Sequence, residues 1–220
     1  MPADMIRGGL SQHIAEWMSE LAKTRPLFHS EADFQLALAM LMTRHGVRGV
    51  RLERRIRVEA PLRSKQFLTV DILAVVDDQR VGLELKYPRR TYTGTVISDG
   101  DPEDYFLRAG ASDIEAADFW HDAERIELLL AEGIIEAGAS IILSNVPYWL
   151  PATLTKTVGR AFALCENRSV ERTTLEWAGK QYSEPVCLTA QYHCRWRPYS
   201  KPPGTEFRYM VLEPGAATTP

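Results

Sequence analysis

Charged residues interrupt two apolar segments of this sequence, and they are the first candidates for chemistry. Asp71 lies within the apolar segment 67–76, and Glu84 and Lys86 lie within the segment 81–87. A buried carboxylate is costly unless it is paired with a cation or binds a metal ion. Two carboxylates and one ammonium group suit phosphodiester hydrolysis, because carboxylate oxygens bind Mg²⁺ or Mn²⁺ and an ammonium group stabilises charge on a phosphate.

The short connection between the two segments determines how these side chains meet. The Asp-Asp-Gln sequence at 77–79 favours a tight turn, so the segments are expected to pair as an antiparallel hairpin. A turn centred on its first two residues places Asp71 opposite Glu84, and a turn centred on its last two places Asp71 opposite Lys86. Both registers remain open. In either one the three side chains share a face, because side chains alternate along a strand.

A third acid stands at the start of a predicted helix. Ser30 is a suitable N-cap, Glu31 follows it in the first turn, and an apolar run continues to Met42. Glu31 would reach the same site if this helix packs over the hairpin. Its position is also explained by the helix dipole alone, because acids stabilise the first turn of a helix.

The remaining elements predict an α/β fold, with a mixed central sheet flanked by helices and a C-terminal, mostly β extension. We expect one domain over 1–220, with an N-terminal helix within 1–29, a core at 30–146, and a helix with strands at 147–220. A polar loop is expected at 88–112, because the segment is weakly patterned. Helices are predicted at 10–23, 113–137 and 152–166, and further strands at 50–58, 140–145, 173–177, 186–192 and 207–212.

Composition limits the class of protein. The 220 residues are 45% hydrophobic and 25% charged with a net charge of −3, which excludes a disordered or collagen-like chain. No apolar run approaches the roughly 20 residues that span a bilayer, and the charged N-terminus is unlike a signal peptide. Three cysteines are an odd number, which argues against a secreted disulfide framework. We therefore expect a cytoplasmic protein that does not contact a membrane.

Charge is unevenly distributed along the chain. Segment 44–90 holds 12 Lys or Arg against 6 Asp or Glu, whereas segment 98–136 holds 12 acids and two arginines. A basic segment can bind a nucleic-acid backbone. The candidate phosphate contacts, which would equally protect an exposed strand edge, are Arg51, Arg55, Arg57, Arg89 and Arg90.

One further arginine lies on the predicted helix 113–137. Asp118, Asp122 and Arg125 form one stripe along that helix. The stripe has two interpretations. It forms a surface ladder of ion pairs, or Arg125, or His121 nearby, faces the site and contacts substrate.

Together, Glu31, Asp71 and the Glu84-Leu85-Lys86 triplet resemble the PD-(D/E)XK nuclease superfamily, over roughly residues 30–145. The resemblance implies a restriction-endonuclease-like core. It also implies that Asp71, Glu84 and the Leu85 carbonyl bind the metal ion, that Lys86 is catalytic, and that Glu31 is a further ligand. Val70 stands where the family often has proline.

The expected function is therefore a metal-dependent nuclease that hydrolyses DNA with Mg²⁺ or Mn²⁺. The resemblance places such a protein in bacterial restriction, repair or anti-phage defence. A cutter of both strands needs two sites, which suggests a homodimer, and the lack of an evident recognition domain suggests low specificity or a targeting protein partner. Two alternatives are an inactive nucleic-acid-binding protein of the same fold, and a protein-interaction module that uses the acidic segment 98–136.

Overall fold

The computed structural model describes residues 9–62, 64–150 and 158–215. In this part of the chain a mixed sheet of six strands forms the centre, in the order β1-β2-β3-β6-β12-β11. Strands β3 and β6 are parallel, and the other neighbours are antiparallel. The strands are β1 (Arg48–Leu62), β2 (Lys65–Val76), β3 (Gln79–Lys86), β6 (Ala137–Ser144), β11 (Arg197–Ser200) and β12 (Phe207–Leu212).

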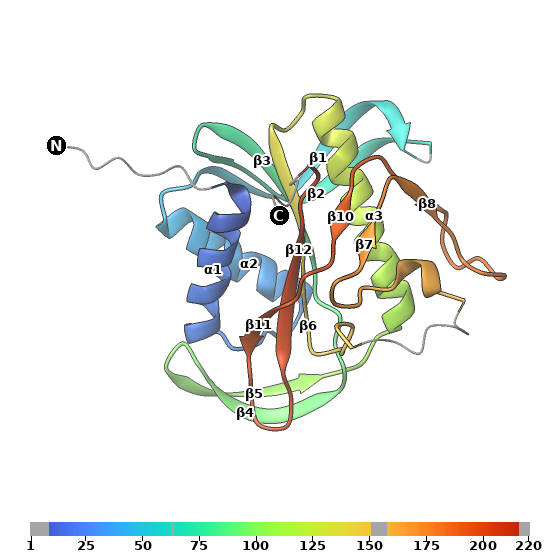
Figure 1. Ribbon diagram of the computed structural model, residues 1–220. Coiled ribbons are helices and arrows are strands. Elements are labelled where there is room, and N and C mark those ends of the chain that lie inside the picture. Colours follow the sequence, from blue (N-terminus) through green and yellow to red (C-terminus); the bar gives the residue numbers. More distant parts are fainter. Residues whose placement is uncertain (1–8, 63, 151–157, 216–220) are drawn as a thin grey trace.

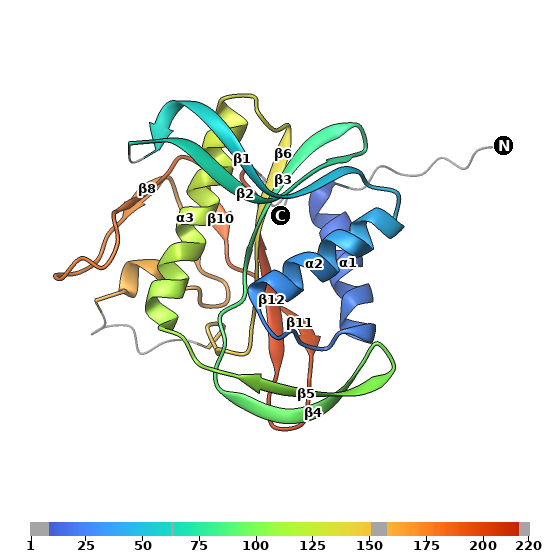
Figure 2. The same cartoon turned by 180° about the vertical axis from the view of Figure 1, so that it is seen from behind.

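Helices cover both faces of the sheet (Figures 1 and 2). Helices α1 (Leu10–Thr24) and α2 (Glu31–Arg44) share one apolar cluster with the sheet residues Ile72, Leu83 and Ile141. Helix α3 (Ser112–Ala131) packs on the opposite face. The expected α/β class, the mixed sheet with flanking helices and the C-terminal strands are thus confirmed.

Local sequence signals account for the first two helices. The buried face of α1 consists of apolar residues at helical spacing, from Leu10 to Leu21. The Ser30 side chain accepts a hydrogen bond from the Asp33 N–H, which caps α2 as expected. The helix ends before Gly46, whose φ of +79° suits a left-handed turn. Both predicted helices are confirmed to within two residues of their ends.

The turn between β2 and β3 decides the register that the sequence left open. Asp77 and Asp78 have φ angles of +48° and +65°, as the two central residues of a tight hairpin turn require. Ile72 consequently pairs with Leu83. The next position along β2 places Asp71 opposite Glu84, so the first of the two registers is correct.

Helix α3 lies in the connection between β3 and its parallel neighbour β6. The close packing of this helix depends on Gly138, where an added Cβ would lie 2.8 Å from both Ile126 and Ile135. The helix ends at Ala131, before Gly133 with its φ of +64°, and β6 begins at Ala137. The predicted helix 113–137 was therefore six residues too long.

The predicted loop at 88–112 is wrong. This segment forms a hairpin of β4 (Tyr92–Ser98) and β5 (Asp101–Leu107), which crosses below the sheet in Figure 1. Its turn is Asp99-Gly100, a pair that favours a two-residue hairpin turn, and both residues have positive φ. The alternation that buries Tyr92, Tyr105 and Leu107 is masked in the sequence by the many acids around the turn.

The C-terminal extension packs against α3 with short strands (Figure 1). The predicted strand 207–212 is confirmed as β12, and the strands at 173–177 and 186–192 are present but shorter. The predicted helix 152–166 is wrong where it can be compared: a 3-10 turn, η2 (Arg160–Phe162), lies there, and residues 151–157 lie outside the described residues. The short strands are β7 (Ser169–Val170), β8 (Thr173–Leu175), β9 (Val186–Leu188) and β10 (Tyr192–His193).

Strands β1 and β2 extend beyond their pairing with β3 as a two-stranded arm, formed by residues 54–62 and 65–70. Apolar residues of the arm, Val58, Leu68 and Val70, pack against Ile126 and Leu129 of α3. The opposite side of the arm is exposed and basic. In the described ranges, no helix is long and apolar enough to cross a membrane.

Candidate active site

The candidate site lies where β2 and β3 separate. Their pairing ends at Ile72 and Leu83, and the carboxylate of Asp71 then takes the place of the backbone ladder. Its Oδ2 accepts a hydrogen bond of 2.6 Å from the Leu85 N–H. The carbonyl of Leu85 points to the same side of β3 as its N–H. A carboxylate and a backbone carbonyl thus face one another at the fork.

Helix α2 brings Glu31 to the same place. One Glu31 carboxylate oxygen accepts a hydrogen bond of 2.8 Å from the Tyr87 N–H, at the end of β3. The other oxygen lies 3.8 Å from Nζ of Lys86. The first turn of α2 therefore reaches the site. This is the condition under which the sequence analysis expected Glu31 to take part.

The opposite side of the site is built by α3. The Arg125 guanidinium donates to both carboxylate oxygens of Glu84, at 2.9 Å and 3.2 Å, and also to Asp122. Nζ of Lys86 lies 3.4 Å from the second oxygen of Asp122. Asp122 is only 2% exposed, so the interpretation of this stripe as a surface ladder is wrong.

Asp122 is the site residue that the sequence did not reveal as such. Its position on the stripe with Arg125 was visible, but its partner Lys86 lies on a strand far away in the chain. Arg125 faces the site as the second interpretation expected. Its guanidinium is engaged by two carboxylates, so its contact with substrate stays a prediction.

The site carries more negative than positive charge. Four carboxylates (Glu31, Asp71, Glu84 and Asp122) surround two cations (Lys86 and Arg125), which leaves an excess of two negative charges when all are ionised. Burial raises the pKa of Asp71 to about 6, and the Leu85 N–H only partly opposes this. Burial also raises the pKa of Glu84, against the attraction of Arg125.

The ammonium group of Lys86 stays protonated at neutral pH. Burial alone would lower its pKa, but the carboxylates of Asp122 and Glu31 outweigh that effect and raise the pKa to about 12. Lys86 is therefore suited to stabilise negative charge and unsuited to accept a proton.

The oxygen donors at the fork fit a hard divalent cation. Among the described residues, no three carboxylate, His or Cys side chains converge closely enough to bind a metal ion by themselves. Mg²⁺ does not need three, because it usually takes one or two protein carboxylates and keeps several waters. Asp71 and the Leu85 carbonyl supply such donors, and Glu84 adds a carboxylate that it shares with Arg125.

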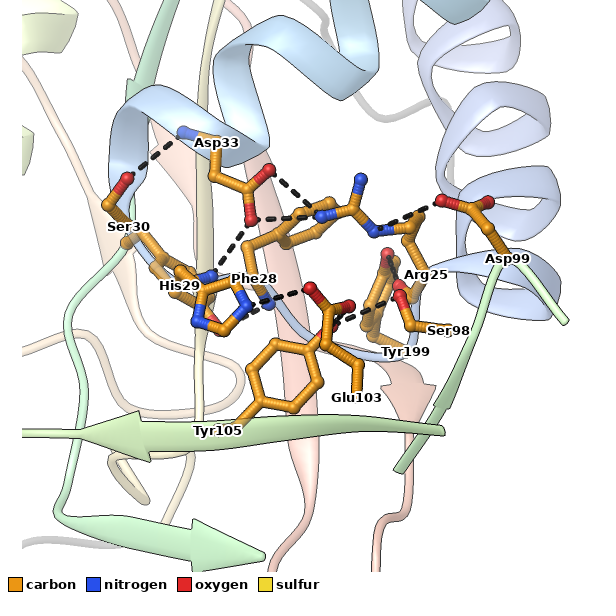
Figure 3. A network of polar contacts seen from close by, with 11 residues as sticks. Arg25, Phe28, His29, Ser30, Asp33, Ser98, Asp99, Glu103, Tyr105 and Tyr199 are labelled. Carbon is orange, nitrogen blue, oxygen red and sulfur yellow. Dashed lines mark hydrogen bonds and ion pairs between the residues drawn. The ribbon is translucent and has the colours of Figure 1, made fainter. Parts of the chain in front are cut away.

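A second polar network fixes the start of α2 to the β4–β5 hairpin (Figure 3). Nη2 of Arg25 lies 2.9 Å from both oxygens of Asp33, which also accepts from the His29 N–H. The His29 ring stacks on Tyr105 with 4.4 Å between ring centroids and hydrogen-bonds to Glu103 at 2.9 Å. This network anchors the segment that immediately precedes the first turn of α2.

The other predicted substrate contacts lie outside the carboxylate cluster. Arg55 and Arg57 are exposed on the arm, where Arg55 lies 4.4 Å above the ring of Phe67. Arg89 and Arg90 follow the end of β3. The Arg89 side chain donates to the His29 carbonyl, and the Arg90 side chain is exposed. The structure thus brings Glu31, Asp71, Glu84, Leu85, Lys86 and Arg125 together. It leaves the five other predicted arginines, including the exposed Arg51 on β1, outside this cluster.

Comparison with protein-family models, curated proteins and solved structures finds no match to this chain. Function is therefore inferred from the site.

Proposed function

We propose that this protein is a metal-dependent nuclease that hydrolyses DNA phosphodiester bonds with Mg²⁺ or Mn²⁺, on a restriction-endonuclease-like core. One observation carries the proposal. The Asp71 carboxylate meets the Leu85 backbone at the fork of β2 and β3, with Glu84 and Lys86 beside it and Glu31 above the end of β3. Oxygen donors beside a fixed ammonium group suit attack on a phosphodiester.

Each side chain has a role that its surroundings support. Asp71, Glu84 and the Leu85 carbonyl would hold the ion, with Glu31 as a further or water-mediated ligand. When bound, the ion neutralises charge on the phosphate and makes a water molecule more acidic. Lys86 is half-buried and protonated, so it acts by stabilising the phosphate charge or by orienting the attacking water, not as a general base.

The surface around the fork offers cations for a nucleic-acid backbone. Arg55 and Arg57 lie on the exposed side of the arm, and Arg89 and Arg90 directly follow β3. Such contacts position a duplex without reading its sequence. A homodimer would supply the second active site that cutting both strands needs, and a protein partner would supply targeting. Restriction, repair and anti-phage defence are the bacterial processes that use such an activity.

The test is cleavage of plasmid and single-stranded DNA with Mg²⁺, Mn²⁺ or EDTA. Asp71→Asn and Lys86→Met are expected to abolish metal-dependent cutting. Asp78→Asn is the matched control, because Asp78 lies in the turn of the same hairpin, is exposed, and asparagine tolerates its left-handed backbone. Cutting that survives in Asp71→Asn would rule out the fork as the active site.

One observation favours a second candidate, an inactive nucleic-acid-binding protein of the same fold. Both oxygens of Glu84 are held by Arg125, which competes with an ion for that carboxylate. This candidate predicts salt-sensitive DNA binding that Asp71→Asn leaves unchanged, and no cleavage with either metal ion.

A further inference from the structure

Gln35 joins three elements beneath the fork. It is buried, at 7% exposure, and lies on α2 one helical turn after Glu31. Its Nε2 donates one hydrogen bond to the Asp71 carbonyl and another to Oε1 of Glu53 on β1, both at 2.8 Å. Both protons of one carboxamide group are therefore used to connect α2 with two neighbouring strands, at the residue that carries the candidate metal ligand.

Glu53 has an unusual backbone for a strand residue. Its φ is +50°, in the left-handed region that residues other than glycine avoid, although it lies in the middle of β1. The pairs Leu52–Ile72 and Arg54–Val70 place it directly across from Asp71. Strained conformations of this kind persist where surrounding contacts hold them, and they concentrate at functional sites.

The alternation of side chains along β2 is broken at Asp71. Val70 packs with α3, whereas Ile72 packs with α1 and α2 on the other face of the sheet. Residues two apart on a regular strand share a face, so the strand twists or bends sharply between them. The left-handed residue of β1 lies across from this point. At the same residue the Asp71 carboxylate accepts its hydrogen bond from the Leu85 N–H.

We propose that Gln35 and Glu53 are positioning residues, which hold the bend in β1 and β2 and thereby aim the Asp71 carboxylate at the fork. Gln35 fixes the main chain of Asp71, and Glu53 supplies the second acceptor that fixes the carboxamide. Neither has to touch substrate. Their effect on catalysis rests on the proposed nuclease function, but their effect on the geometry of Asp71 does not.

The geometry is tested first, in metal-free protein. The backbone amide of Leu85 reports the Asp71 carboxylate, because a short charge-assisted hydrogen bond shifts the proton resonance of an amide downfield. Gln35→Leu and Glu53→Gly are expected to move the Leu85 amide resonance upfield and to speed its exchange with solvent. Glu53→Gln keeps an acceptor oxygen, so the Leu85 amide of this variant should resonate as in the wild type.

Two controls, and the choice of glycine at position 53, separate positioning from general destabilisation. The Leu83 amide lies in the regular β2–β3 ladder and should stay unchanged in every variant. Leu36→Ala alters the exposed neighbour of Gln35 and should leave the Leu85 resonance in place. Glu53→Gly removes the acceptor while relieving the left-handed strain, so this variant keeps its fold even if Gln35→Leu does not. An unchanged Leu85 resonance in Glu53→Gly would overturn the proposal.

The catalytic consequence is tested on DNA. If the wild type cuts, Gln35→Leu and Glu53→Gly should lower kcat by about 100-fold with little change in KM, because a misaimed group slows chemistry without weakening binding. Glu53→Gln should recover most of this loss. Equal kcat in all four proteins would overturn the catalytic part. A wild type that cuts no DNA would overturn the proposed function instead, and the Leu85 resonance would still decide the positioning.

Discussion

The guanidinium of Arg125 on α3 holds both carboxylate oxygens of Glu84 on β3, which is 1% exposed. Removing one partner of a buried ion pair leaves the other charge unpaired. Arg125→Met should therefore lower the free energy of unfolding by about 3–5 kcal/mol in urea denaturation at pH 7. The double variant with Glu84→Gln should recover much of this loss.

The control for this variant is Arg48→Met, since Arg48 and its partner Asp78 are both exposed. Its free energy of unfolding should stay within about 1 kcal/mol of the wild type. Similar losses in Arg48→Met and Arg125→Met would contradict a special role for the buried pair.

Metal-free stability should depend on pH through Asp71. Its pKa in the folded protein is about 6, above the ordinary value of 3.8, so the folded state binds this proton more tightly than the unfolded state. The stability that the protonated Asp71 side chain contributes to the fold is fully present below pH 3.8 and is lost as the pH rises through 6. Asp71→Asn removes the cost of burying an ionised carboxylate and should stabilise the protein at pH 7 by about 1–2 kcal/mol.

Urea unfolding in EDTA at pH 5 and pH 8 measures this difference. The gain from Asp71→Asn over the wild type should be larger at pH 8 than at pH 5. An equal gain at the two pH values would show that the pKa of Asp71 is the same in the folded and unfolded states.

Divalent cations should stabilise the wild type by mass action. At a metal concentration 100 times the Kd, binding to the folded state alone adds about 2.7 kcal/mol. Mg²⁺ and Mn²⁺ should therefore raise the Tm of the wild type in a concentration-dependent way, measured by thermal denaturation, and should leave the Tm of Asp71→Asn unchanged. The same rise in both proteins would place the ion elsewhere.

Arg55 and Arg57 should contribute to DNA affinity through phosphate contacts. Each removed contact makes the negative slope of log K against log salt shallower by about 1, and the effect depends little on the DNA sequence. Arg55→Gln and Arg57→Gln should show this in fluorescence anisotropy over a salt series. Lys201→Gln, an exposed residue between β11 and β12, should match the wild type. A wild-type slope in both arginine variants would show that the arm does not contact DNA.

Local signals explain the parts of the fold that the sequence predicted. The cap at Ser30, the stop at Gly46 and the apolar runs of β2 and β3 each depend on neighbouring residues. The register of that hairpin was not decidable, because either pair within Asp77-Asp78-Gln79 can form a turn. The left-handed angles of Asp77 and Asp78 in the folded chain select one of them.

Non-local contacts explain most of what was missed. Asp122 belongs to the site because α3 packs over β3, and no spacing in the sequence reports which helix face meets which strand. Gln35 and Glu53, the proposed positioning residues, are joined by a contact between α2 and β1 that the sequence does not reveal. The β4–β5 hairpin was missed for a different reason, since its Asp99-Gly100 turn signal is local but lies among acids that conceal the strand alternation.

The path from β3 to β6 predicts an order in which the protein assembles. The β2–β3 hairpin has a short turn and can form early, whereas β3 and β6 pair only after residues 87–136 have closed a long loop. We therefore expect Glu84 to stay hydrated in the folding chain until α3 docks with Arg125. If this docking follows the main folding barrier, Arg125→Met will accelerate unfolding and leave the refolding rate nearly constant, as stopped-flow kinetics can measure. The fold would then resist opening at the same ion pair that holds Glu84, a candidate ligand of the proposed metal ion.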